Sequence, residues 1–403
     1  MMYLNIGKME CIKMAGNYEI SKVNLNEEYA LLRVPEIQVE GSKVVNLSRA
    51  VSKKLPNSFI TNVYLNNVKS TFYEVFMRID LARLRNIDSD PDARQAFIDS
   101  RFPPNIAANG AYRSRLIPLI ILVVEINVGD RLLESDIDYI NDIITWVSNK
   151  IYVTPILRFA DEINRSDRIK FYEDFIKRLL ISKKTLPSGI RAAASVPTLY
   201  PPTKIPEVLE RYKDENKSPS FVVIDFDRNR MTSSRMIGAT NGVRRYFRRE
   251  EGEEPKYAIY AFNVKPYKKG IEASLAEDIG CYLSGISVIG DSYKLSPVNK
   301  LFIPPAVKLS DLPKIFDTES YMYERLSTDN LVGRFSNWYA SLTDKTINAP
   351  YSKYSPYIYR FNIEKTATEL TKLSKMVVNG EIESLKEKLK NKEIVSALKG
   401  KTF

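Results

Sequence analysis

Two aspartates, Asp225 and Asp227, end the apolar run 221–224 and precede a segment rich in arginine. A pair of carboxylates can divide the roles of acid and of base or nucleophile, as in glycosyl transfer, when their surroundings separate their pKa values. Glu125 also ends an apolar run, and with the two aspartates it would offer oxygen ligands to Mg²⁺ for phosphoester chemistry. Lys265 offers a third chemistry, a Schiff base, if burial lowers its pKa. These four residues are the candidate catalytic residues.

Seven arginines lie in the 22 residues from 228 to 249, without an acidic residue among them: Arg228, Arg230, Arg235, Arg244, Arg245, Arg248 and Arg249. Such a cluster can hold the phosphates of a nucleic acid. Tyr246 and Phe247, which lie within it, can stack on bases. The glutamates that follow, at 250, 251, 253 and 254, offer the alternative of ion pairs within the protein. We predict a nucleic acid, RNA or DNA, as the partner.

Further polar side chains lie where apolar runs end, and we take Asp80, Asn127, Arg158 and Asn263 as candidate substrate-binding residues. In a strand, alternate side chains share a face. Asp80 can therefore lie on the same face as Arg78, Asn127 on that of Glu125, Asn263 on that of Lys265, and Arg158 on that of Thr154. Convergence of such groups from separate strands is what a catalytic site requires. The alternative is that Arg78, Arg158 and Lys265 neutralise the neighbouring carboxylates as buried ion pairs.

Three residues on loops complete the candidate substrate-binding set. Tyr200 belongs to the proline-dense loop 196–202, which we expect to be stiff and to hold the ring over the strand ends. Gly290 and Ser292 follow the apolar run 286–289, the seventh of the predicted strands. In (β/α)8 barrels the loops after the seventh and eighth strands often bind a phosphate. The glycine spacing of 285–292 resembles a P-loop, but Asp291 occupies the lysine position, so no ATP-binding loop is predicted.

The chain has no histidine and two cysteines, which excludes the usual zinc sites, histidine-ligated haem and histidine-activated nucleophiles. No GxGxxG motif occurs, so no dinucleotide site is predicted. Mg²⁺ remains the one cofactor that the candidate residues suggest. The net charge of +11 fits an anionic partner, although solvated ion-pair networks give some proteins a similar composition.

Short apolar segments alternate with segments of helical period from residue 73 onward, which indicates an α/β domain with parallel strands. The predicted strands are 73–80, 116–127, 151–158, 189–196, 221–227, 257–264 and 286–289, with helices such as 133–149 and 166–182 between them. An eighth strand at 300–303, followed by a helix at 310–326, would complete a (β/α)8 TIM-barrel-like core. The alternative is an open doubly wound sheet.

The flanking regions differ from this core. We predict a small β-rich N-terminal region over 1–58, the barrel-like core over 59–326 and a tyrosine-rich, helical C-terminal region over 327–403. Residues 59–66 lie too close to the strand at 73 for a helical crossover, so they are predicted to pair with it antiparallel. We find no transmembrane run and no signal peptide, and we expect a cytoplasmic protein without a membrane partner.

Three functions follow as alternatives. The favoured one is an enzyme that acts on a nucleic acid or a nucleotide, by base exchange, which is a glycosyl transfer, or by phosphoester chemistry. The second is a basic nucleic-acid-binding or assembly protein without catalysis, in which the barrel is a scaffold. The third is a small-molecule lyase or aldolase that uses Lys265, for which the arginine cluster would be incidental.

Overall fold

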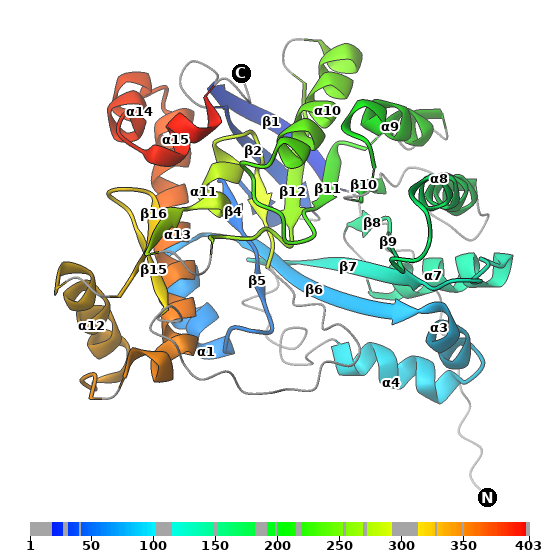
Figure 1. The fold of residues 1–403 in the computed structure, drawn as a ribbon, viewed down its shortest axis with the longest axis horizontal. Coiled ribbons are helices and arrows are strands. Elements are labelled where there is room, and N and C mark those ends of the chain that lie inside the picture. The colour runs from blue at the N-terminus through cyan, green and yellow to red at the C-terminus, as the bar shows by residue number, and fades with distance from the viewer. Residues whose placement is uncertain are drawn as a thin grey trace, which may run out of the picture.

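The protein has a mixed α/β fold with parallel sheets (Figure 1). The structure, a computed structural model, describes residues 18–26, 31–39, 42–101, 115–147, 151–181, 192–197, 200–214, 219–252, 255–268, 272–291, 313–326, 329–348 and 350–399. Within these residues no helix combines the length and the apolar character needed to cross a bilayer.

Two parallel sheets form the centre of the fold. One has the order β5–β6–β7–β9, made of β5 (Val51–Ser52), β6 (Thr71–Asp80), β7 (Leu116–Ile126) and β9 (Ile156–Phe159). The other has the order β4–β14–β12–β11–β10–β8, made of β4 (Ser48–Arg49), β14 (Val288–Ile289), β12 (Ala258–Phe262), β11 (Phe221–Asp225), β10 (Ala192–Val196) and β8 (Tyr152–Val153).

The chain passes directly from one sheet to the other at two places. At Ala50 it leaves β4 and enters β5, and at Thr154 and Pro155 it leaves β8 and enters β9. Proline has no N–H to donate to a ladder, which explains the second interruption. Thr154 compensates, because its Oγ1 accepts a hydrogen bond from the backbone N–H of Ser195 at 2.9 Å. The end strands of the two sheets are therefore halves of the same two segments.

Helices follow most of the parallel strands, and in Figure 1 α3, α7, α8, α9 and α10 lie one after another around the strands. Their bounds are α3 (Leu81–Asp88), α4 (Pro91–Arg101), α7 (Glu134–Val147), α8 (Arg165–Ile181), α9 (Ile205–Asp214), α10 (Ser234–Glu251) and α11 (Glu277–Tyr282). In α7 the isoleucines Ile137, Ile140 and Ile144 recur at helical spacing and are buried against the sheet.

The strands bury both faces in two separate apolar cores. On β11, Val222 and Ile224 belong to the core under the helices, whereas Phe221 and Val223 belong to a second core, called the inner core, which also contains residues of β6, β7 and β12. Neighbouring residues of this strand therefore face opposite cores, as the alternation of side chains along a strand requires. By the same parity Asp225 lies on the inner side, at the carboxyl end.

An antiparallel sheet of β1 (Tyr18–Asn26), β2 (Leu32–Val39) and β3 (Ser42–Val44) covers the amino ends of the strands. Tyr18 packs on Phe221 with ring centroids 6.0 Å apart, and its hydroxyl donates to the Ala192 carbonyl at 3.1 Å. Phe221 and Ala192 are the first residues of their strands. The inner core is thus covered at the end opposite to Asp225.

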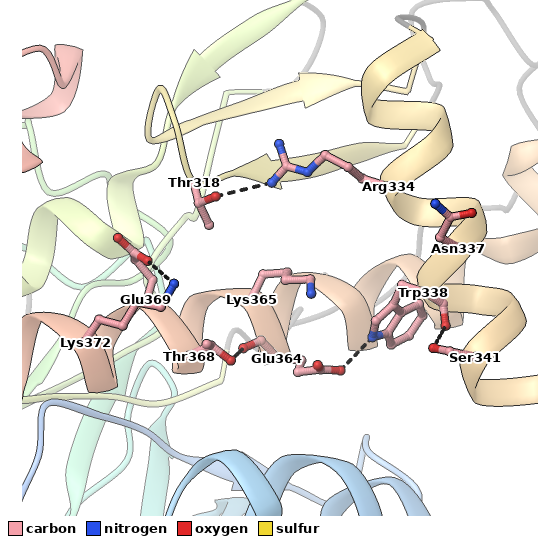
Figure 2. A pocket seen from close by; sticks show the side chains of 10 residues that line it. All are labelled: Thr318, Arg334, Asn337, Trp338, Ser341, Glu364, Lys365, Thr368, Glu369 and Lys372. Atoms are coloured by element: carbon pink, nitrogen blue, oxygen red, sulfur yellow. Dashed lines mark hydrogen bonds and ion pairs between the residues drawn. The ribbon is translucent and has the colours of Figure 1, made fainter.

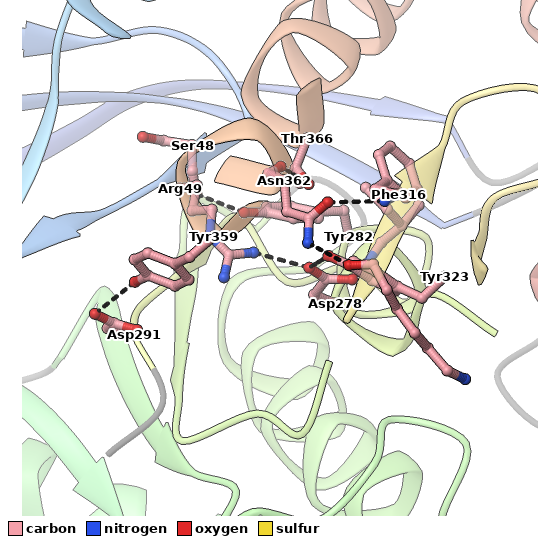
Figure 3. Close-up of polar contacts among 12 residues, drawn as sticks. Ser48, Arg49, Asp278, Tyr282, Asp291, Phe316, Tyr323, Tyr359, Asn362 and Thr366 are labelled. Atoms are coloured by element: carbon pink, nitrogen blue, oxygen red, sulfur yellow. Dashed lines mark hydrogen bonds and ion pairs between the residues drawn. The ribbon is translucent and has the colours of Figure 1, made fainter. Parts of the chain in front are cut away.

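The C-terminal region is mainly helical. A small antiparallel sheet, β13 (Ala273–Leu275), β16 (Met322–Arg325) and β15 (Lys314–Asp317), leads into α12 (Asp329–Thr343), α13 (Ser355–Val378), α14 (Ile382–Leu389) and α15 (Glu393–Leu398). The long helix α13 packs against β4, β1, β2 and β15. Hydrogen bonds fix it there (Figure 3): the Phe316 N–H of β15 donates to the Asn362 amide oxygen of α13 at 2.8 Å, and Tyr359 of α13 donates to Asp291 at 2.9 Å.

The seven strands that we predicted from residue 73 onward are all present. The strand predicted at 59–66 is wrong, because this segment forms the short helices α1 (Asn57–Phe59), η1 (Ile60–Tyr64) and α2 (Leu65–Asn67). Its buried residues Phe59, Ile60 and Tyr64 have helical spacing. The helix predicted at 310–326 is also wrong over its described part, which forms the β15–β16 hairpin. The strand predicted at 300–303 lies outside the described residues.

Candidate functional site

Asp225 lies at the carboxyl end of β11 with 3% of its surface exposed. Its Oδ1 accepts hydrogen bonds from the backbone N–H of Asp227 at 2.8 Å and from the Asn263 amide at 3.3 Å. Arg158, at the end of β9, approaches its other oxygen at 3.6 Å and donates to Asp227 Oδ1 at 2.7 Å. We call Asp225, Asp227, Arg158 and Asn263 the strand-end site.

Burial raises the pKa of Asp225 to about 6, although Arg158 and the hydrogen bonds from Asp227 and Asn263 act in the opposite direction. A carboxyl group with a pKa near the working pH can both give and take a proton. Asp227, by contrast, is exposed and pairs with Arg158. The two carboxylates therefore have different environments, as a division into acid and base or nucleophile requires.

One hydrogen-bond donor of the Arg158 guanidinium is unsatisfied within the described residues. Its Nε is buried and has no hydrogen-bond partner among the described residues. Leaving a buried charged donor unsatisfied is costly, so such groups in native sites commonly face a ligand or water. The Nε atoms of Arg33, Arg49 and Arg325 are in the same state, so this feature is not specific to the strand-end site.

The backbone of the site is strained. Asp227, Arg228 and Asn263 have φ of 44°, 59° and 59°, in the left-handed region that residues with a side chain rarely adopt. The Arg228 N–H donates to the Asn263 carbonyl at 2.8 Å, which joins the two strained segments. Such conformations cost about 1–3 kcal/mol each and cluster at functional sites.

Glu277 accepts two hydrogen bonds from the loop after β11, and no sequence pattern indicated this residue. The Thr232 hydroxyl donates to Glu277 Oε1 at 2.7 Å, and the Thr232 N–H donates to Oε2 at 2.9 Å. Burial raises the pKa of Glu277, while these hydrogen bonds and the nearby Arg230 lower it. Glu277 thus fixes the loop that carries Arg228 and Arg230, both of which are exposed.

The seven arginines do not form one cluster. Arg235 begins α10 near Arg165 and Asp227, and its pKa is lowered by burial first and by Arg165 second. Arg244, Arg245, Arg248 and Arg249 lie further along the helix, so the last of them is about 20 Å from Arg235 at 1.5 Å per residue. Arg249 pairs there with Glu210 and Glu250 at 2.6 and 2.8 Å.

The other polar residues at strand ends have partners within the protein. Glu125 pairs with Arg78 at 2.5 Å, as the ion-pair alternative expected. Asp80 caps α3 by accepting a hydrogen bond from the Arg83 N–H at 2.7 Å. Asn127 is exposed on the turn after β7, where its N–H donates to Asp130 at 2.7 Å. The structure does not join these residues directly to Asp225.

Lys265 and the loop candidates have separate surroundings. Lys265 is half-buried, and its N–H donates to the Asn229 carbonyl at 3.1 Å. Tyr200 is buried, and its hydroxyl donates to Glu173 on α8 at 2.5 Å. We expected its ring to lie over the strand ends, where a substrate could reach it, but the ring is not exposed. Ser292 lies outside the described residues.

A second buried group, missed from the sequence, surrounds Gly290. Glu74 on β6 accepts a short hydrogen bond from Tyr260 and one from the Asp291 N–H at 3.2 Å. Asp291 accepts from the Ser52 hydroxyl at 2.7 Å and pairs with Lys54 at 3.2 Å. A Cβ on Gly290 would overlap Glu74 and Tyr260, so the glycine is needed for close packing. Glu74, Tyr260 and Ser52 lie on the strands β6, β12 and β5 and belong to no motif.

The described residues contain no group of three or more His, Cys, Asp and Glu side chains arranged to hold a metal ion. Glu125, which we expected to join Asp225 and Asp227 in a magnesium site, pairs with Arg78 instead. The strand-end site therefore contains the carboxylates of Asp225 and Asp227 without that of Glu125.

No protein-family model matches the chain, and no curated protein matches it in sequence.

Proposed function

We propose that the protein is an enzyme that acts on a nucleic acid or a nucleotide at the strand-end site, by glycosyl transfer such as base exchange. The observation that carries this proposal is Asp225: a buried carboxyl with a pKa of about 6, adjacent to Arg158 and an exposed second carboxylate. Strained backbone at Asp227, Arg228 and Asn263 supports a functional role for the same place.

We also propose that the two parallel sheets form one closed (β/α)8 barrel. The support is the set of strand pairs, which run β5–β6–β7–β9 and β8–β10–β11–β12–β14–β4, with β4 continuous with β5 and β8 with β9. The inner apolar core fits the packed interior of such a barrel. In barrels of this kind the active site lies at the carboxyl ends of the strands, where Asp225 is.

In the proposed reaction protonated Asp225 gives its proton to the leaving nucleobase as the bond between the base and the sugar breaks. The carboxylate of Asp227 stabilises the positive charge that develops on the sugar carbon, or attacks that carbon. An incoming base or water then takes the sugar, and its proton returns to Asp225. Phosphoester chemistry is less favoured because Glu125 is not gathered with the two aspartates.

The arginines next to the site would hold the phosphates of the substrate. Arg228 and Arg230 are exposed on the loop after β11, and Arg235 begins the helix that follows. The guanidinium of Arg158, which is partly exposed beside Asp227, would bind an oxyanion of the substrate. The arginines at the far end of α10 are outside this proposed contact.

Binding across a salt series tests the nucleic-acid part of the proposal. Purified protein is titrated with labelled RNA, duplex DNA and single-stranded DNA, beside the pairs Arg228→Ala/Arg230→Ala and Arg248→Ala/Arg249→Ala. We expect binding that weakens steeply with salt, and a lower salt slope, by about two phosphate contacts, in the first pair alone. The second pair removes equal charge at a distance and is the matched control.

Equal losses in both pairs would show that only the overall charge matters. Absence of binding to each nucleic acid near about 100 mM salt would contradict the choice of a polymeric substrate and direct the search to free nucleotides.

A further inference from the structure

A polar groove of about 660 Å³ lies between α12, α13 and the β15–β16 hairpin (Figure 2). None of the residues that line it belongs to the strand-end site. In Figure 2 Lys365 of α13 lies below Arg334 of α12, with Trp338 towards one end and Lys372 towards the other. Concave sites of this size commonly hold small molecules.

The groove has an unusual lining for two neighbouring helices. On α12 it is lined by residues at i, i+3, i+4 and i+7, which are Arg334, Asn337, Trp338 and Ser341. Residues with this spacing share one helix face, which is apolar where helices pack directly. Here only Trp338 has a large apolar ring. The two helices contact each other through the aromatic residues Phe335, Trp338 and Phe361.

The carboxylates in the groove are engaged by the protein. Glu364 accepts a hydrogen bond from the Trp338 indole N–H at 2.6 Å. Glu369 is buried, accepts from the Tyr321 hydroxyl at 2.6 Å and pairs with Lys388 at 2.6 Å. Both carboxylates thus already accept hydrogen bonds within the protein.

The donors in the groove are less fully engaged. Lys365 is half-buried, its ammonium lies 5.4 Å from the Phe361 ring, and no carboxylate of the described chain pairs with it. Lys372 reaches Glu369 only at 3.9 Å. The Asn337 amide has no hydrogen bond to any described residue. Donors therefore exceed acceptors, and a ligand that fits must supply oxygen acceptors with negative charge.

We infer that this groove is a second binding site, for a small ligand that carries a phosphate group, with Lys365 and Lys372 on the phosphate oxygens. Thr368 of α13 lies between the two lysines in Figure 2, and its hydroxyl suits a hydroxyl group of a sugar. This inference is independent of the chemistry proposed for Asp225.

Tryptophan fluorescence tests it. The chain has two tryptophans, and in a Trp146→Phe variant Trp338 in the groove is the remaining reporter. The variant is titrated with ribose 5-phosphate, inorganic phosphate and ribose. We expect a saturable change with ribose 5-phosphate and none with ribose at the same concentrations. Adding Lys365→Gln/Lys372→Gln should weaken the binding by about tenfold or more, because two charge-assisted hydrogen bonds are lost.

The control pair Lys386→Gln/Lys390→Gln removes the same charge from α14 and should leave the titration unchanged. Arg228→Ala/Arg230→Ala should also leave it unchanged, since these residues lie at the other site. The inference would be overturned if the α14 pair weakened binding equally. It would also be overturned if ribose gave an equal response, or if neither phosphate compound gave a saturable response. Unfolding midpoints of all variants establish that each is folded.

Discussion

At the scale of single residues, the buried Asp225 should make stability depend on pH. Its pKa in the folded state is about 6, above the value of about 4 in an unfolded chain, so the folded protein binds the proton more tightly. The resulting stabilisation is complete below about pH 4 and is lost as the pH rises through about 6. In Asp225→Asn this dependence is absent.

We therefore expect the free energy of unfolding of the wild type, relative to Asp225→Asn, to fall by up to about 3 kcal/mol between pH 4 and pH 7. Urea unfolding at several pH values measures this difference. A difference that stays constant over the range would mean that Asp225 titrates normally.

Gly290 gives a second prediction at this scale. Gly290→Ala should lower the free energy of unfolding by about 1–3 kcal/mol, because the added Cβ would overlap Glu74 and Tyr260. Gly333→Ala on α12, where nothing lies within 4 Å of the added Cβ, should be neutral or stabilising by up to about 1 kcal/mol. Similar urea midpoints for the two variants would show that the site at Gly290 can relax.

Some of the site was predictable residue by residue, and some was not. Strand parity placed Asp225 correctly on the inner side, and it paired Arg158 with the carboxylates as one alternative. The alternation of side chains could not show that Glu74 of β6 accepts a hydrogen bond from Asp291, which follows β14. That contact depends on which strands are neighbours, and one sequence does not specify strand order.

At the scale of elements, α13 is joined to the parallel sheets by Tyr359, which reaches Asp291 after β14. Tyr359→Phe should lower the free energy of unfolding by about 1.5–3 kcal/mol, because a buried carboxylate loses a hydrogen bond. Tyr357→Phe is the matched control: this ring packs on Tyr339 and should tolerate loss of the hydroxyl within about 0.5 kcal/mol. Equal losses in chemical denaturation would contradict a specific role for the Tyr359 hydroxyl.

The long strands and helices were predictable because their apolar periods extend over many residues. The short ones were not. The segment 48–52 adds to both parallel sheets as β4 and β5, yet only two residues pair on either side of Ala50. Two residues carry no period. In 59–66 the aromatic and branched residues favour a strand by composition, while their spacing of about four residues is helical.

At the scale of the whole molecule, the excess positive charge is spread over separate places. Seven arginines that are close in sequence become two sets, because α10 carries the second set about 14–21 Å along its axis from Arg235. The groove between α12 and α13 contributes further cations in the C-terminal region. Composition predicted an anionic partner, but only the fold shows which cations lie beside the carboxylates.

The most direct test of the central claim is release of a nucleobase. Wild-type protein, Asp225→Asn and the control Asp174→Asn on α8 are incubated with labelled RNA, DNA and free nucleotides, and the liberated base is measured by chromatography. We expect release by the wild type and the control, and a loss of about 10²–10⁴-fold in Asp225→Asn with binding retained. Undiminished release by Asp225→Asn, or binding by the wild type without any release, would contradict catalysis by Asp225.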